Sequence, residues 1–353
     1  MSDDEEATSA VTSMLSKGMQ ILFAVVCVAS LPSTAVFTYG MYAEVYERQA
    51  KYPEYPVFGD LLPAVWYGIA LIAIRWVLTH YVFGPMSLSW LSPHKREPKH
   101  VGKFCDSAYQ FIYFIGSSSV LLYVLLNPKD TLSNILPPSL GGSGEIANCW
   151  RGAPYEYFLS PNLTTIYLVE LGFHIQSIVW HVAFQDARSD HVEMLSHHIV
   201  TIILIVFSFV GNMSRIGIVI LLIHDLPDIF VFWAKLGANT PYTKFTLTGF
   251  ALMLATWGYM RLYVLPFVIF NSSWFEAVTI AGPFPGMYFL NGCLFFLIIL
   301  HAYWYILFID IGLHFLNTGE TVDKQSLEPG TELKSNNTNT NTNTNTNTNI
   351  KQE

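Results

Sequence analysis

Five ionisable side chains stand close together inside otherwise apolar sequence. His197 and His198 open one apolar segment, and His224, Asp225 and Asp228 lie within the next. A charged side chain at the centre of a lipid bilayer costs about 2.5–3.5 kcal/mol even on lenient insertion scales. Two aspartates facing lipid would be hard to tolerate. We therefore expect this cluster to face a protein-lined cavity and to carry out chemistry there.

The spacing of these residues suits acyl transfer. On a helix, His224 and Asp228 are four residues apart and Asp225 and Asp228 are three apart, so they share one face. His197 and His198 diverge by about 100°, so we expect only one of them to point directly at a reacting atom. A histidine oriented by a carboxylate can take a proton or attack a carbonyl. The sequence has no G-x-S-x-G serine elbow, so the histidines themselves would do this work.

Other polar side chains lie at or near membrane depth in the remaining apolar segments. Each is consistent with lining the cavity or with internal pairing, and they are Glu170, His174, His181, Arg261 and His301. His80 and His314 are equally consistent with hydrogen bonding between helices. The H-x-x-x-H and H-x-x-H-H boxes of membrane di-iron enzymes are missing. We therefore expect no metal and no cofactor.

The composition indicates a polytopic membrane protein. Of 353 residues, 52% are hydrophobic, 15% aromatic and only 12% charged, whereas soluble chains carry roughly 25% charge. The net charge of −8 lies partly in the acidic N-terminus, Asp3 to Glu6, and in the C-terminal tail. No basic stripe is present, so we expect no nucleic-acid partner.

Apolar runs of about 20 residues predict an all-α polytopic membrane protein with about eight transmembrane helices. They lie near residues 19–42, 61–83, 107–127, 162–184, 194–210, 213–236, 246–270 and 286–314. The first run follows Lys17, lacks a small-residue cleavage site and is too long for a signal peptide, so it is expected to be a retained span.

The loops predict the orientation in the membrane. Lys and Arg are more frequent in the loop at 84–106 and in the other loops on that side, which places both termini in the cytosol. Three N-x-S/T sequons, at Asn162, Asn212 and Asn271, then fall on the lumenal side. The Asn/Thr repeat from about residue 336 has few apolar side chains to bury and is predicted to be disordered.

The run from Met194 to Lys235 closely resembles the Lag1 motif of the ceramide synthases, which lies within the TRAM-Lag1-CLN8 (TLC) domain. The resemblance rests on His197-His198, Thr201, Ser208, Asn212, Arg215, Gly217, His224-Asp225, Asp228 and Lys235. It extends over about residues 60–315, through Lys103 to Ser107, Tyr167 and Glu170, then Arg261, His301 and Trp304.

The resemblance implies a division of the chain. The expected parts are an acidic N-terminus (1–18), an additional helix with a lumenal loop (19–60), a helix with a basic cytosolic loop (61–102), the TLC domain (103–316, Lag1 motif 194–235) and a disordered tail (317–353). It also implies that the third to eighth spans form a six-helix barrel that encloses an acyl chain.

The implied activity is N-acylation of a sphingoid base by a fatty acyl-CoA, which is a co-substrate, in the endoplasmic reticulum membrane. The base would be sphinganine, sphingosine or phytosphingosine, membrane lipids would surround the protein, and its apolar faces would accommodate a homo- or heterodimer. The catalytic candidates are His197, His198, His224, Asp225 and Asp228. The substrate-binding candidates are Glu170, His174, Arg215, Arg261, His301 and Trp304.

The sequence leaves two questions open. His197 or His198 could remove a proton from the attacking amine or could form an acyl-imidazole, and Asp225 and Asp228 could orient the imidazole or hold the ammonium. The alternative to an enzyme is a TLC-domain protein that only senses or binds lipid. A passive lipid cavity has no need for this costly polar cluster, which favours the enzyme. A transporter is a third interpretation, but the sequence shows no repeated halves.

Overall fold

The computed structural model describes residues 38–127, 132, 134–154, 160–184, 190–238, 240–282 and 285–318, and it contains no strand within these ranges. Six helices in this part of the chain are long and apolar enough to cross a membrane: Phe58–Trp90, Pro98–Leu126, His191–Val210, Ser214–Gly237, Thr243–Ile280 and Gly286–Asn317. The polytopic all-α fold is therefore confirmed. The predicted first span and the predicted disordered tail lie largely outside the described residues.

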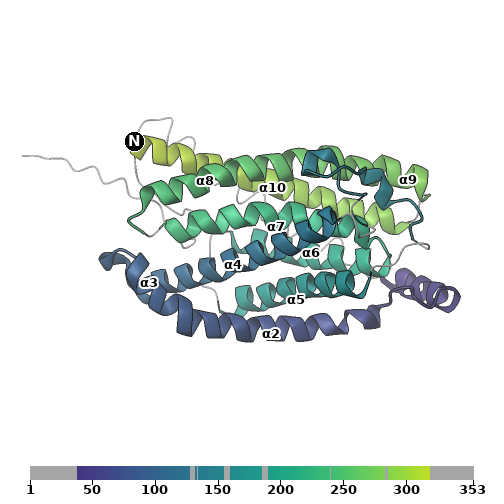
Figure 1. Cartoon of the computed structure of the whole chain (residues 1–353), viewed down its shortest axis with the longest axis horizontal. Coiled ribbons are helices and arrows are strands. Elements are labelled where there is room, and N and C mark those ends of the chain that lie inside the picture. The colour runs from purple at the N-terminus through teal and green to yellow at the C-terminus, as the bar shows by residue number, and fades with distance from the viewer. Residues whose placement is uncertain are drawn as a thin grey trace, which may run out of the picture.

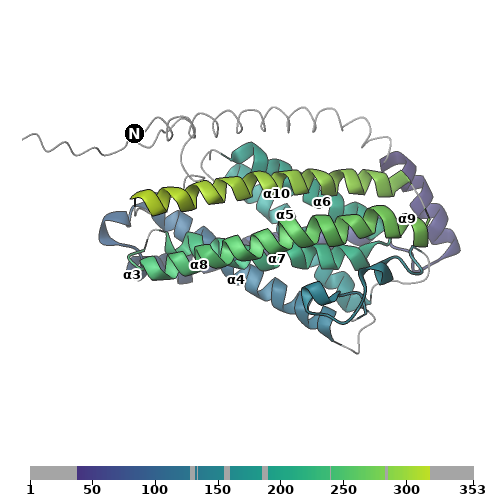
Figure 2. The ribbon, with the colours of Figure 1, turned by 90° about the horizontal axis from the view of Figure 1, so that it is seen from above.

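The helices lie side by side along the long axis of the molecule (Figures 1 and 2). They are α2 (Leu62–Leu78), α3 (Gly84–Trp90), α4 (Pro98–Leu126), α5 (Pro161–Ala183), α6 (His191–Val210), α7 (Ser214–Gly237), α8 (Thr243–Trp257), α9 (Ala277–Ile280) and α10 (Pro285–Thr318). We name the two ends of the bundle after α3 and α9, which lie at opposite ends in Figure 1. The long helices alternate in direction between these ends.

Residues 38–51 form a further helix at the α9 end, where a loop had been expected from residue 43 onward. This stretch is rich in Ala, Glu, Met, Gln and Lys, which favour helices. Glu44 and Arg48, one turn apart, form an ion pair on it. The predicted connection between the first two spans therefore begins with helical residues.

Proline residues mark where several helices begin. Pro98 and Pro161 occupy the first positions of α4 and α5, where the fixed φ of proline suits the helix and its missing N–H costs nothing. The segment joining α8 to α9 is different, because it is π-helical over Gly258–Phe270 and again over Ser272–Glu276. Wide π turns inside α-helices occur frequently at functional sites, and Arg261 lies on the first of them.

The helix α5 was predicted as a span, and it is long enough to be one, but it is more polar than the six helices above. Glu170, His174, Gln176 and His181 are all buried on it. These side chains face the interior of the bundle, where α5 packs between α2 and α6. Polar side chains that would be costly in contact with lipid thus lie against other helices.

The helix α2 lies outside the predicted TLC domain but packs closely against it. A Cβ atom built on Gly172 of α5 would lie 2.8 Å from the carbonyl oxygen of Ala64, and one on Gly68 would lie 3.0 Å from the Gly172 oxygen. Small residues at such a crossing let two backbones approach closely. The buried Arg75 of α2 also pairs with Asp106 of α4 at 2.8 Å. We conclude that α2 belongs to the same bundle as α4 to α10.

The segment 134–154 closes the α9 end of the bundle. Its Trp150 is buried and donates a hydrogen bond from Nε1 to Ser272 Oγ at 2.9 Å. The Asn212 amide is also buried and donates to the Pro154 carbonyl oxygen at 2.5 Å. This engaged amide is a poor position for a glycan, whereas the other two predicted acceptors, Asn162 and Asn271, are exposed.

Candidate active site

A cavity of about 180 Å³ lies inside the bundle. Its walls come from α4 to α8, from the π-helical segment after α8 and from α10, and Arg75 is the contribution of α2. All five predicted catalytic residues line it: His197, His198, His224, Asp225 and Asp228. Both residues of the adjacent His197-His198 pair line this cavity, and which of them would point directly at a reacting atom stays a prediction.

The histidines form a continuous series of neighbouring rings in the wall of the cavity and, at His301, directly behind it. The ring centres of His198 and His197 are 5.5 Å apart, and that of His197 is 6.0 Å from His301. His301 in turn is 5.0 Å from His224. On the other side, His198 is 5.9 Å from His174. Four helices, α5, α6, α7 and α10, therefore bring their histidines to one place.

Several ring nitrogens in this series have no hydrogen-bond partner among the described residues. They are Nδ1 of His174, His197 and His198, Nε2 of His224, and both nitrogens of His301. The case of His224 is the most informative, because its Nδ1 lies 2.7 Å from the carbonyl oxygen of Ile220 and must donate to it. In a neutral imidazole the other nitrogen is then an acceptor. His224 Nε2 is thus free to receive a proton.

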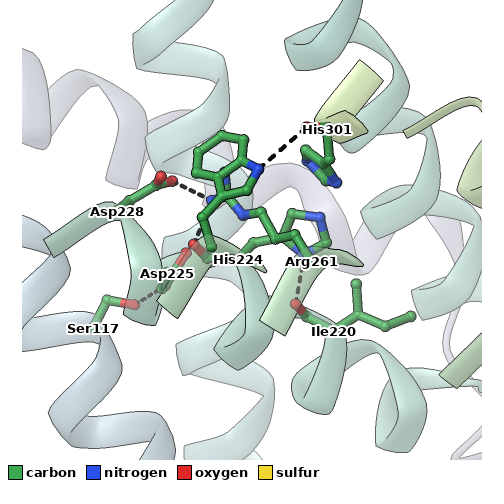
Figure 3. Close-up of polar contacts among 8 residues, drawn as sticks. Ser117, Ile220, His224, Asp225, Asp228, Arg261 and His301 are labelled. Atoms are coloured by element: carbon green, nitrogen blue, oxygen red, sulfur yellow. Dashed lines mark hydrogen bonds and ion pairs between the residues drawn. The ribbon is translucent and has the colours of Figure 1, made fainter. Parts of the chain in front are cut away.

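Asp228 and Arg261 form an ion pair beside the histidines, in which the arginine is buried and the aspartate is partly exposed (Figure 3). Arg261 Nη2 lies 2.8 Å from Asp228 Oδ2 and donates to the backbone oxygen of His224 at 2.6 Å. The guanidinium also stacks over the Trp257 ring at 3.9 Å, and Trp257 Nε1 donates to the His301 backbone oxygen at 3.2 Å. Arg261 therefore connects α7 to the segment after α8, and its charge is compensated by Asp228.

Asp225 faces a different neighbour. The Ser117 hydroxyl of α4 contacts Asp225 Oδ2 (Figure 3). The same hydroxyl lies 2.6 Å from Glu170 Oε1 of α5. Both carboxyl groups are buried, but only Asp225 lines the cavity. The two aspartates of α7 thus have separate surroundings, one paired with an arginine and the other linked through a serine to a second carboxyl group.

The remaining predicted substrate-binding residues divide into two groups. Trp304 lines the cavity with its ring centre 5.5 Å from that of His197, and His174 also lines it. Arg215 lies apart, in the first turn of α7 at the α9 end, where it donates to the Arg151 backbone oxygen at 3.3 Å. Nine residues separate it from His224, which is about 13 Å along a helix.

The site includes residues that the sequence did not single out. Ser117 is a serine in a run of three serines, Ser117 to Ser119, and nothing in that run marks its partners. Arg75 lines the cavity with its guanidinium over the Trp180 ring at 3.8 Å. An arginine inside an apolar span is the signal that could have identified it. Within the described ranges, no group of three or more His, Cys, Asp or Glu side chains is arranged to hold a metal ion.

Comparison with known proteins places this geometry in context. Residues 103–310 match the family profile described as the TLC domain. The chain is 30% identical to the Caenorhabditis elegans ceramide synthase hyl-2 over 310 residues, which cover 80% of this chain and 89% of that protein. It is 28% identical to the Arabidopsis thaliana ceramide synthase LOH1 over 76% of this chain and 90% of that protein.

A human relative is similar over a shorter part of its length. The chain is 30% identical to the Homo sapiens ceramide synthase 4 over 223 residues, which are 63% of this chain. The chain spans only about half of that relative, since the match covers 53% of it.

Proposed function

The chain belongs to the ceramide synthase family of TLC-domain proteins, and on that premise we propose that it transfers a fatty acyl group from acyl-CoA to the amine of a sphingoid base. The observation that carries this proposal is the cavity, in which unpartnered histidine nitrogens and two aspartates lie at the end of an apolar pocket. An acyl chain would occupy the apolar part, and its thioester carbonyl would lie beside the histidines.

The reaction requires two proton transfers, and the site offers groups for both. A sphingoid base enters largely as an ammonium ion, which must lose a proton before its nitrogen can attack the thioester carbon. The amine then forms the amide bond while the carbon–sulfur bond breaks, and the second amine proton passes to the leaving thiolate. A neutral imidazole can accept and return such a proton, which contributes about 10²–10⁴ to the rate.

Two routes through these residues remain available. His197 or His198 acts as the base in direct attack, or one of them takes the acyl group first and passes it on as an acyl-imidazole. In either route, Asp225 is the carboxylate placed to hold the ammonium, because Asp228 is already paired with Arg261. Ceramide or dihydroceramide and free CoA are the products.

Acyl transfer in microsomes that lack endogenous ceramide synthase tests the proposal. Wild-type protein should convert a sphingoid base and at least one member of a panel of acyl-CoA lengths into ceramide. If folded wild-type protein forms no product with any chain length, while a known ceramide synthase is active in the same membranes, the enzyme proposal fails. Binding of labelled lipid without turnover would then favour the non-enzymatic lipid-binding alternative.

We also propose that the protein resides in the endoplasmic reticulum membrane with both termini in the cytosol. The Lys and Arg residues of the segment 95–103 at the α3 end support this orientation. An N-x-T acceptor introduced at Ser143, in the exposed segment at the α9 end, should be glycosylated. The same acceptor placed at Lys95 should not be, and the reverse pattern would invert the orientation.

A further inference from the structure

The Ser117 hydroxyl contacts the carboxyl groups of both Glu170 and Asp225, but it has only one proton to donate. The Ser117 hydroxyl lies at hydrogen-bond distance from an oxygen of each carboxyl group. A hydroxyl has one proton to donate, and its oxygen accepts from other donors. If both carboxyl groups were ionised, one of the two contacts would join two oxygens with no proton between them. One of the two carboxyl groups must therefore carry a proton.

The charges around Glu170 and Asp225 also indicate that one of these two carboxyl groups is protonated. The nearest cation on α7 and its neighbours, Arg261, is engaged by Asp228. No ion pair to Glu170 or Asp225 is present among the described residues. Two buried carboxylates without a cation would be very costly, and such groups generally neutralise instead. One negative charge on the pair is the most that these surroundings support.

Contact with the cavity distinguishes the two carboxyl groups, which are equally buried. Glu170 does not line the cavity, and its Oε2 is buried without a hydrogen-bond partner in the described part of the chain. The Tyr113 hydroxyl lies beside Glu170 and interacts with it, but without a hydrogen bond of regular geometry. An unpartnered oxygen is tolerated better as the carbonyl of a neutral acid than as part of a carboxylate. Asp225, by contrast, lines the cavity.

We propose that Glu170, Ser117 and Asp225 form a unit that holds a single shared proton, with Glu170 as the neutral member and Asp225 as the carboxylate presented to the cavity. The Glu170 O–H donates to Ser117 Oγ, and the Ser117 O–H donates to Asp225 Oδ2. Glu170 is then a positioning residue, which orients Ser117 and keeps the negative charge on Asp225. This inference rests on the proposed function, since the Asp225 charge would hold the ammonium group of the sphingoid base.

The protonation state can be tested without any turnover. Infrared difference spectra of purified wild-type protein and the Glu170→Gln variant should show a protonated carboxyl C=O band in the wild type that is absent from the variant. This band should shift in deuterium oxide. Glu44→Gln, at an ion-paired and exposed carboxylate, is the matched control and should remove only a carboxylate band. Absence of a protonated carboxyl difference in Glu170→Gln would overturn the proposal.

The kinetic test compares variants that keep or remove the hydrogen bonds. Glutamine has the shape and neutrality of the protonated acid, so Glu170→Gln should keep kcat within about threefold of wild type, whereas Glu170→Ala should lose at least tenfold, roughly the effect of one broken buried hydrogen bond. Asp225→Asn should raise KM for the sphingoid base by about tenfold or more and leave KM for acyl-CoA nearly unchanged.

The outcomes separate this proposal from the proposed function. If wild-type protein is active but Glu170→Gln is as inactive as Glu170→Ala, with both variants folded, an ionised Glu170 is required and the shared proton is wrong. If wild-type protein forms no ceramide, the proposed function fails, while the infrared result still decides the protonation state. A monodisperse elution profile and an unchanged melting temperature in detergent establish folding for each variant.

Discussion

The two halves of the cavity differ in chemistry. From the histidine series to the α3 end, the lining includes Arg75, His181, Asp228 and Lys235, and we call this the charged half. Toward the α9 end, the lining side chains carry no charge. They are mostly apolar and include Ile216, Met287, Leu290 and Leu294, with Ser208, Ser273 and Asn291 as neutral polar members, and we call this region the apolar half. The proposed reacting groups lie where the two halves meet, which is consistent with a substrate whose carbonyl lies beside them and whose hydrocarbon chain lies in the apolar half.

The largest expected effect comes from removing the histidines at this boundary. Replacement of His197 or His198 by Ala should reduce ceramide formation by about 10²–10⁴-fold for the residue that acts as base or nucleophile. The measurement is initial rate of acyl transfer in microsomes with matched amounts of protein. His224→Ala, which removes the free Nε2 acceptor, should also reduce the rate.

The control for these variants is a histidine outside the boundary. His80, which contacts the Trp76 backbone oxygen and is exposed, should tolerate replacement by Ala with no more than about a twofold loss, since it makes no contact with the cavity. Full activity of both His197→Ala and His198→Ala would contradict the location of the chemistry. An equal loss in His80→Ala would instead indicate a general effect on folding.

The ion pair in the charged half should contribute mainly to stability. Arg261→Met leaves the partly buried Asp228 without its partner, and breaking a fully buried pair costs about 3–5 kcal/mol, which is an upper bound for this pair. The expected result is a clear fall in melting temperature in detergent. The double variant Arg261→Met with Asp228→Leu should recover much of the loss, because no charge is left unpaired. A double variant less stable than either single one would disprove the pairing.

The sequence predicted the helices and the gathering of His197, His198, His224, Asp225 and Asp228 at one cavity more readily than the contacts around them. Apolar run length and the cost of charge in lipid identify helices such as α6 and α7 and direct Asp225 inward. They do not identify Ser117, because a hydroxyl is tolerated in any helix, nor the hydrogen bond of Arg215 to the Arg151 backbone oxygen, which comes from a different segment of the chain. Which residues of different helices contact one another depends on how the helices pack, and the residue pattern along one helix does not contain this information.

The apolar half should be sensitive to volume rather than charge. Leu294 of α10 is 3% exposed and lines the cavity, so Leu294→Trp would fill part of the space for the chain. Overpacking of this kind costs typically about 1–3 kcal/mol. We expect activity with the longest accepted acyl-CoA to fall by roughly tenfold or more, and activity with shorter chains to fall less.

The neighbouring residue provides a matched control. Phe295 is 52% exposed on the outer surface of the same helix, so Phe295→Trp adds bulk without entering the cavity. It should leave the chain-length profile unchanged. If Leu294→Trp loses the same fraction of activity at every acyl-chain length, the apolar half does not determine chain-length preference. The functional distinction between the two halves would then be wrong.

The smallest expected effect concerns the closed end of the apolar half. Cys149 is buried next to Trp150, a lining residue, and burial raises the pKa of the Cys149 thiol to about 12. The thiolate is the reactive form, and a raised pKa keeps the group protonated at neutral pH. Maleimide should therefore leave Cys149 unlabelled in the folded protein and label it after denaturation, as read by peptide mass spectrometry.

The control is an introduced Ser143→Cys, exposed in the same segment, which should label readily in both states. Rapid labelling of Cys149 in folded, active protein would mean that water reaches the α9 end of the cavity, and the apolar half would then be an open channel rather than a closed pocket for a chain.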